Sequence, residues 1–300
     1  MYGGAEMSVE NLKKRSAMLR SLREFFYSRG FFEVETPVRI PAPAPEEYIE
    51  AVPAEGGFLR TSPELALKRL LAGGGERFFE LGKAFRSGEF GRKHREEFTI
   101  LEYYAAHWDY RQLAAFTAEL FAAAAREVCG STKITFQGRG LDLANVEYVT
   151  VDAAYRKYAG VSAFAADERS DFDELMVTKV EPELGKSGIT FLIDYPANRA
   201  SLSRLSAADP RVAERWEVYI SGIELGNAFG ELVDAAEQKR RFAAAYKFRA
   251  EQGMKPYPEP RDFYAALERG IPESSGCAVG VDRLAMILCD ASDIAKVRWE

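Results

Sequence analysis

A basic and aromatic segment in the first third of the chain has the residue types of a phosphate and base site. The loop between two expected strands, 78–86 and 97–104, carries five basic side chains: Arg86, Arg92, Lys93, His94 and Arg95. Alternation along the second strand puts an aromatic ring, a carboxylate and a phenol on one face. The residues of that face are Phe98, Ile100, Glu102 and Tyr104. On residue types alone, an exposed charged hairpin is the more common explanation of such a segment.

Two acids flank a second expected turn. Ser221-Gly222 is a two-residue hairpin signal, and this turn pairs Tyr219 with Glu224. Glu217 and Glu224 then lie diagonally on one face. Two carboxylates close together cost energy unless a cation lies between them. They are either solvated surface acids or a divalent-cation site.

Three further polar or aromatic residues follow on the same strand. Strict alternation puts Asn227, Phe229 and Glu231 on the face opposite Glu224. All of them reach one pocket only if the strand bulges near Gly226, where glycine is suited to the backbone. An unbroken strand over 223–231 would contradict this hypothesis.

Composition restricts the class of protein. The 300 residues hold 40 Lys and Arg against 46 Asp and Glu, a formal net charge of −6. This charge argues against a dedicated nucleic-acid binder, which usually shows a basic excess. No apolar run approaches the roughly 20 residues of a membrane span, and no signal peptide is visible, so we expect a cytoplasmic location. The three cysteines lack metal-ligand spacing, which predicts buried free thiols.

The elements that must position these residues alternate without a regular βαβ order. We expect helices at 8–29, 63–71, 112–128, 235–252 and 281–288, and strands at 31–35, 78–86, 97–104, 189–193, 212–220, 223–229 and 277–279. This order predicts an α+β fold with a mainly antiparallel sheet flanked by helices. Residues 1–7 are expected to be a leader or disordered start, and residues 8–300 one domain.

These segments resemble the three motifs of class II aminoacyl-tRNA synthetases. Residues 85–104 resemble motif 2, residues 30–37 (GFFEVETP) motif 1, and residues 276–284 (GCAVGVDRL) motif 3. Residues 61–64, 214–217 and 222–232 resemble segments of the lysyl branch. All occur in the family's order over residues 20–290, whereas neither a G-x-G-x-x-G loop nor a P-loop is present.

The resemblance implies an ATP site with Mg²⁺ and a class II catalytic domain. Arg86 would hold the α-phosphate and the substrate carboxylate, Arg283 the tail phosphates and adenine, and Phe98 the other adenine face. Glu217 and Glu224 would hold the metal. Arg86 and Arg283 are the expected catalytic residues. The residues expected at ATP are Arg86, Ser87, Gly88, Glu89, His94, Arg95, Phe98, Glu224, Leu225, Gly280 and Arg283.

The same resemblance implies a pocket for a lysine-like amino acid. Glu64 would meet the backbone amino group and Asn227 the carboxylate, and two acids and a phenol would hold the side-chain ammonium. The expected substrate-binding residues are Ser62, Pro63, Glu64, Glu102, Tyr104, Asn227, Phe229 and Glu231. A desolvated cation needs such charged partners.

The sequence departs from the synthetase pattern in three places. Gly88 takes the position of the second motif 2 acid, with Glu89 beside it, so the contact to the adenine amino group is open. Arg95-Glu96 replaces Asn-Pro, and Ala278 replaces a glycine near the amino-group pocket.

We expect the chain to lack the anticodon-binding domain that precedes this domain in lysyl-tRNA synthetases. It is similar in this respect to the elongation factor P–(R)-β-lysine ligase family, as are residues 209–219. We therefore expect activation of β-lysine or lysine, transfer to elongation factor P, no tRNA substrate and a homodimer. An enzyme that acylates tRNA or another acceptor, and a non-catalytic lysine sensor, are the alternatives.

Overall fold

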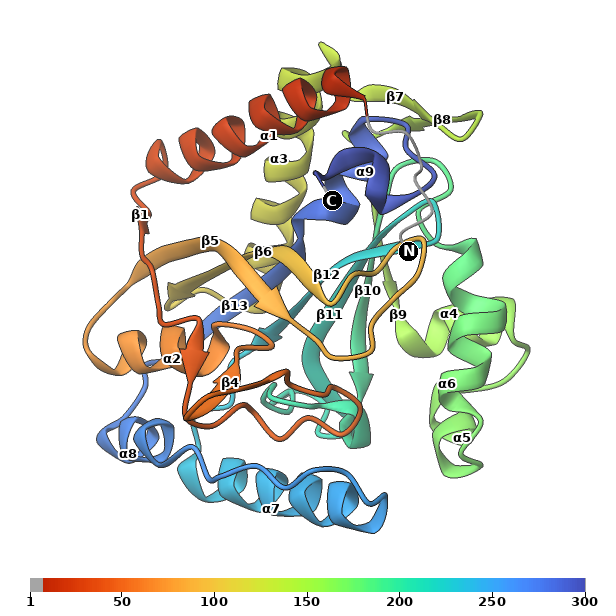
Figure 1. Cartoon of the computed structure of the whole chain (residues 1–300). Helices are drawn as coiled ribbons and strands as arrows, with labels where there is room; N and C mark the ends of the chain where they lie inside the picture. Colours follow the sequence, from red (N-terminus) through yellow and green to blue (C-terminus); the bar gives the residue numbers. More distant parts are fainter. Residues whose placement is uncertain (1–7, 300) are drawn as a thin grey trace.

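An eight-stranded sheet forms the centre of the molecule in the computed structural model, which describes residues 8–299 (Figure 1). Its strand order is β1-β5-β6-β13-β12-β11-β10-β9. The β1–β5 and β9–β10 pairs are parallel and the other pairs are antiparallel. The strands are β1 (Phe32–Glu33), β5 (Arg77–Phe85), β6 (Glu97–Ala106), β9 (Val146–Thr150), β10 (Ile189–Pro196), β11 (Val212–Ile220), β12 (Ile223–Gly230) and β13 (Ser274–Gly280). The expected α+β, mainly antiparallel architecture is confirmed.

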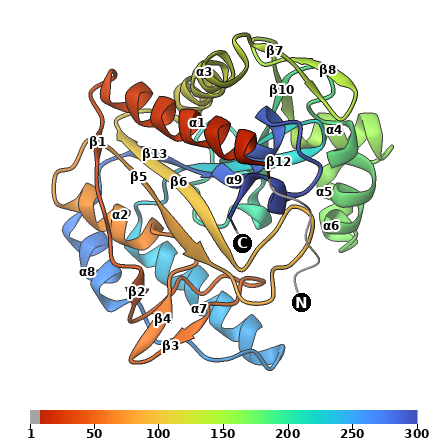
Figure 2. The ribbon, with the colours of Figure 1, turned by 45° about the horizontal axis from the view of Figure 1, so that its top comes forward.

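Helices lie on both sides of this sheet. The α-helices are α1 (Val9–Tyr27), α2 (Glu64–Ala72), α3 (Tyr110–Cys129), α4 (Val151–Tyr158), α5 (Ala163–Glu168), α6 (Phe172–Leu175), α7 (Ala235–Glu251), α8 (Arg261–Arg269) and α9 (Val281–Leu288). Helices α1, α3 and α9 pack on one face, as Figure 2 shows. Helices α2, α7 and α8 gather on the opposite side (Figure 1).

Alternation along β6 supplies both sides of the sheet with buried residues. Leu101 and Tyr103 join the core under α1, α3 and α9, whereas Tyr104 joins the core with α2 and α8. Successive side chains of a strand point to opposite faces, so the two cores share one strand. Phe26 stacks on Phe79 in the first core, with ring centroids 4.5 Å apart.

Local sequence signals explain where several elements begin and end. Ser8 caps α1 by accepting hydrogen bonds from the backbone N–H groups of Glu10 and Asn11. Asp109 and Gln112 form a capping box at the start of α3. Ser221 and Gly222 both have positive φ, of 52° and 68°, as a type I′ hairpin turn requires.

Several small elements were not expected from the sequence. They are β2 (Arg39–Ile40), β3 (Pro53–Ala54), β4 (Gly57–Leu59), β7 (Lys133–Phe136), β8 (Arg139–Asp142), α8, the π-helix η1 (Met176–Val180) and the 3-10 helices η2 (Glu181–Glu183), η3 (Ala197–Arg199) and η4 (Ile294–Val297). Strands β2, β4 and β3 form a separate sheet, and β7 and β8 form another. Apart from α8, which has nine residues, these elements have two to five residues and contain too few positions to show a period.

The expectation that all three cysteines are buried needs correction. Only Cys277 is buried, whereas Cys129 is exposed and Cys289 is half-buried, so the prediction of three buried thiols is wrong for two of them, although all three are free. Of the Phe31-Phe32 pair, Phe31 is buried in the core and only Phe32 is exposed. The expected leader, residues 1–7, lies outside the described residues. Between residues 8 and 299, no helix combines the length and apolar character that crossing a membrane requires.

Candidate active site

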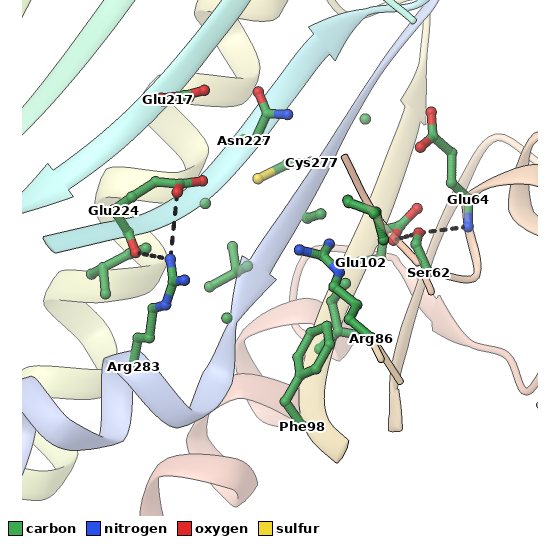
Figure 3. A pocket seen from close by; sticks show the side chains of 18 of the residues that line it. Ser62, Glu64, Arg86, Phe98, Glu102, Glu217, Glu224, Asn227, Cys277 and Arg283 are labelled. Carbon is green, nitrogen blue, oxygen red and sulfur yellow. Dashed lines mark hydrogen bonds and ion pairs between the residues drawn. The ribbon is translucent and has the colours of Figure 1, made fainter. Parts of the chain in front are cut away.

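A cavity of about 310 Å³ opens on the face of the central sheet formed by β6, β12 and β13 (Figure 3). Most of the site residues expected from the sequence line it. These are Ser62, Glu64, Arg86, Glu89, His94, Arg95, Phe98, Glu102, Tyr104, Glu217, Glu224, Leu225, Asn227, Phe229, Glu231, Gly280 and Arg283. The expected residues Pro63, Ser87 and Gly88 do not line it. Motifs 2 and 3 and the three lysyl-type segments thus bring side chains to one place, whereas no residue of motif 1 lines this cavity.

One end of the cavity is acidic. The Glu102 carboxylate is buried, and it accepts hydrogen bonds of 2.7 Å from Ser62 Oγ and from Tyr104 Oη. Ser62 Oγ also accepts the backbone N–H of Glu64 at 3.0 Å, so it joins the start of α2 to this acid (Figure 3). Burial, and then the charge of Glu64, raise the pKa of Glu102 to about 8.

Two more acids at this end share one lysine. Lys68 Nζ lies 2.6 Å from Glu64 Oε1 and 2.6 Å from Glu231 Oε2. Burial raises the pKa of Glu231 to about 7, although the charge of Lys68 opposes the shift. Gly276 lies against Glu231 and the Tyr104 ring so closely that a Cβ atom there would overlap both. The acids therefore surround a small space that β13 keeps open.

The other end of the cavity is basic and aromatic. The Arg86 guanidinium lies over the Phe98 ring, 5.1 Å from its centroid, and its Nη1 is 3.8 Å from Glu89 Oε1. Arg86 Nε is buried and has no hydrogen-bond acceptor among residues 8–299. This donor and the half-buried Phe98 ring line the cavity, where they suit a ligand with a phosphate and a base.

Arg283 faces Arg86 from the start of α9, and both point into the cavity (Figure 3). Its Nη1 donates to the Glu224 backbone oxygen at 2.8 Å and lies 3.4 Å from Glu224 Oε2. Its Nη2 lies 2.5 Å from His94 Nε2. Burial, and then the charge of Arg283, lower the pKa of His94, so the imidazole is neutral at pH 7 and donates or accepts a hydrogen bond without adding charge.

The hairpin acids lie where the turn chemistry predicted, and the expected bulge is confirmed. Tyr219 pairs with Glu224, but the next pair is Val218 with Gly226, so Leu225 is the extra residue. This shift lets Glu224 and residues 227, 229 and 231 line the same cavity. A Cβ atom at Gly226 would lie 2.7 Å from the Ala278 carbonyl oxygen, which explains the glycine beside the bulge.

Ala278 of β13 lies between the strands that carry Asn227 and Glu102. It pairs with Asn227 of β12 on one side and with Glu102 of β6 on the other. Its methyl group lines the cavity. A methyl group here takes up space between the amide and the buried acid.

Comparison with known proteins agrees with this geometry. Residues 4–299 match the family model described as tRNA synthetases class II (D, K and N). The chain belongs to the class II tRNA synthetases. It is 38% identical to the elongation factor P–(R)-β-lysine ligases of Pectobacterium atrosepticum and Vibrio cholerae, and 37% identical to that of an Enterobacter species. Each match covers 97% of this chain and 94% of the relative.

The metal site expected in this class II synthetase domain has two candidate ligands. Glu217 is held by Arg215 Nη2 and by Tyr219 Oη, each at 2.6 Å. Burial, and then the charge of Glu217, raise the pKa of Glu224. A cation would relieve this repulsion, so the two carboxylates fit Mg²⁺. No group of three or more His, Cys, Asp or Glu side chains within residues 8–299 is arranged to hold a metal. Mg²⁺ commonly takes one or two carboxylates and completes its shell with phosphates and water.

Several residues of the site were missed by sequence reasoning. Arg215 contacts both Asn227 Oδ1, at 3.2 Å, and Glu217. Glu181 of η2 lies near the hairpin acids, and burial with the charges of Glu217 and Glu224 raises its pKa to about 7. Glu46, whose pKa burial raises to about 7, lines the cavity from the proline-rich loop. Lys68 had a signal, because its i+4 spacing from Glu64 on a helix predicts an ion pair.

Proposed function

We propose that this class II synthetase is an ATP-dependent, AMP-forming ligase that activates (R)-β-lysine, or lysine, and transfers it to a lysine side chain of elongation factor P. One observation carries the proposal. The cavity joins an acidic end, with Glu64, Glu102 and Glu231, to a basic and aromatic end with Arg86 and Arg283. This arrangement suits an amino acid with two ammonium groups beside a nucleotide.

In the first step, an oxygen of the amino acid carboxylate attacks the α-phosphorus of ATP. The bond from that phosphorus to the bridging oxygen breaks, and pyrophosphate leaves with the electron pair. Arg86 neutralises the charge that the carboxylate and α-phosphate bring together, and Arg283 with His94 holds the departing phosphates. Catalysis then depends on positioning and charge stabilisation.

Glu217 and Glu224 would hold Mg²⁺ in this step. The metal, when bound, supplies positive charge to the phosphate oxygens and orients the pyrophosphate group. The protein contributes the position of the two acids, which Arg215, Tyr219 and the bulge fix.

In the second step, a neutral amine of the acceptor attacks the carbonyl carbon of the adenylate. A nitrogen–carbon bond forms, the bond between that carbon and the phosphate oxygen breaks, and AMP leaves while the nitrogen loses a proton. The acceptor of the relatives is named as elongation factor P, and we propose the same acceptor and a cytoplasmic location here.

The position of Ala278 supports β-lysine as the substrate. Because the methyl group lies between Asn227 and Glu102, it fills space beside the expected site of the backbone amino group. An amino group moved by one carbon along the chain avoids this methyl group. Lysine, with its amino group on the α-carbon, would fit less well.

Pyrophosphate exchange tests the first step. We expect exchange above background with (R)-β-lysine, weaker exchange with lysine, and none with 6-aminohexanoic acid, which lacks the second ammonium group. Absence of exchange with every diamino acid would instead favour a lysine-binding module. Offering elongation factor P and tRNA as acceptors in parallel then separates a protein ligase from a tRNA-acylating enzyme.

A further inference from the structure

Lys68 is a buried cation directly behind the acids of the amino-acid pocket. It lies on α2, one turn after Glu64, and its side chain is 1% exposed, as is that of Glu231. Its Nζ contacts both acids at 2.6 Å. The two acids line the cavity, whereas Lys68 does not. It therefore acts on the pocket only through the acids it holds.

Lys68 contacts one oxygen of each acid, so the other carboxylate oxygens remain as hydrogen-bond acceptors for a ligand. Lys68 pairs with Oε1 of Glu64 and with Oε2 of Glu231. The remaining oxygen of Glu231, Oε1, is buried without a hydrogen-bond partner among residues 8–299. A buried carboxylate oxygen without a donor costs free energy, and a ligand ammonium group would remove that cost.

The net charge at the acidic end of the cavity matches that of a ligand with two ammonium groups. When ionised, the carboxylates of Glu64, Glu102 and Glu231 carry three negative charges, and Lys68 cancels one of them. The two that remain equal the two ammonium groups of a diamino acid whose carboxylate lies at the arginine end. Glu46 also lines the cavity, but the largest charge acting on it is that of Arg86, so it is counted with the arginine end. Arg204 is the next cation toward Glu231, but its Nε is paired with Glu214 at 2.7 Å.

The charge count requires a protonated Lys68, and the surroundings of this side chain favour its charged form. Burial acts to lower its pKa, but the charges of Glu231 and Glu64 outweigh burial, and the pKa rises above its ordinary value. Lys68 therefore stays charged across the physiological range.

We propose that Lys68 is a specificity-determining positioning residue: it fixes Glu64 and Glu231 and sets the net charge of the pocket to match two ammonium groups. This inference rests on the proposed function, because it concerns the same pocket. Lys68 touches neither substrate nor ATP, so its effect is on amino-acid binding rather than on the reacting atoms.

Replacement of Lys68 by methionine removes the charge and keeps a long apolar side chain. We expect Lys68→Met to raise the KM for (R)-β-lysine in pyrophosphate exchange at least tenfold, with the KM for ATP within twofold and kcat within threefold of the unmodified protein. Lys247→Met is the matched control, since the Lys247 side chain is 78% exposed on α7. It should leave all three parameters unchanged.

Two further measurements separate charge matching from a merely structural role. In Lys68→Ala, n-propylamine should restore exchange, whereas n-propanol, of similar size without charge, should not. Lys68→Arg keeps the positive charge between Glu64 and Glu231, so its KM for (R)-β-lysine should be lower than that of Lys68→Met. A structural role predicts no such recovery.

Each outcome decides the question. An unchanged KM for (R)-β-lysine in folded Lys68→Met overturns the inference, and so does a loss that neither the amine nor Lys68→Arg recovers. If Lys68→Met does not fold, Lys68→Ala refolded with n-propylamine replaces it, and failure to recover exchange counts against the inference. Failure of the unmodified protein to activate any diamino acid would instead contradict the proposed function.

Discussion

Protonation of the acidic end connects single residues to substrate binding. Glu102 is buried and hydrogen-bonded to Ser62 and Tyr104, and its pKa is raised to about 8. Glu231, with a pKa raised to about 7, lies beside it in the same pocket. Below these values the carboxyl groups hold protons, and an ammonium group can form an ion pair only after a proton leaves. Substrate binding is thus linked to proton release.

The affinity for (R)-β-lysine is therefore expected to rise with pH between 6 and 8. Each proton released on binding changes the dissociation constant by up to about tenfold per pH unit. Titration calorimetry in phosphate and in Tris should give different heats, because the buffers take up the released protons with different enthalpies. Equal heats in both buffers and a dissociation constant independent of pH would contradict this linkage.

The arginine end is expected to act on the rate more than on amino-acid binding. Arg86→Ala should lower kcat of pyrophosphate exchange by about 10²–10³, the usual cost of losing one group that stabilises transition-state charge. Arg86→Lys should recover only part of the lost kcat, since a lysine side chain lacks the planar set of N–H donors of a guanidinium group. Arg139→Ala is the control, because Arg139 is an exposed residue at the start of β8 and does not line the cavity. Rates equal to those of the control would exclude a catalytic role for Arg86.

At the scale of elements, the bulge in β12 determines which side chains share the cavity. Without Leu225 as the extra residue, Glu224 and Asn227 would lie on opposite faces of the sheet. Beside the bulge, Gly226 has no room for a side chain, because a Cβ atom there would meet the Ala278 carbonyl oxygen of β13. One glycine thus supports both the metal acids and the amino-acid pocket.

Gly226→Ala tests this dependence. The new methyl group would lie 2.7 Å from the Ala278 carbonyl oxygen, so β12 and β13 must move apart. We expect a loss of about 1–3 kcal/mol in the free energy of unfolding, as is typical of overpacking, together with loss of exchange activity. Gly140→Ala is the control because no heavy atom lies within 4 Å of its new methyl group. A Gly226→Ala protein as stable and active as this control would show that the strands tolerate the change.

The elements show how far the sequence could predict this site. The bulge was predictable, because alternation put Glu224 and Asn227 on opposite faces while both belonged to one expected site. The position of Glu46 was not, because the loop that carries it has no period and is held by Arg249 of α7. Arg249 Nη1 donates to the backbone oxygens of Glu46, at 2.8 Å, and of Ile49, at 3.1 Å. Contacts between segments so distant in the sequence leave no local pattern.

For the whole molecule, we expect a dimer that uses the start of the chain. Phe32 of β1 is 47% exposed and Tyr27 of α1 is 53% exposed, so apolar surface remains beside the edge of the sheet. Phe32→Asp should lower the mass measured by light scattering to that of a monomer, whereas Val177→Asp, on the 61% exposed Val177, should not. Equal masses for both variants would place the interface elsewhere or show that the protein is monomeric.

We propose that one cavity both activates the diamino acid and delivers it to a protein. The most direct test incubates the enzyme with ATP, labelled (R)-β-lysine, elongation factor P and tRNA, and measures the label on each acceptor by mass spectrometry. We predict one β-lysyl group on a lysine side chain of elongation factor P and none on tRNA. Adenylate formation without transfer to elongation factor P, or label on tRNA alone, would contradict the account.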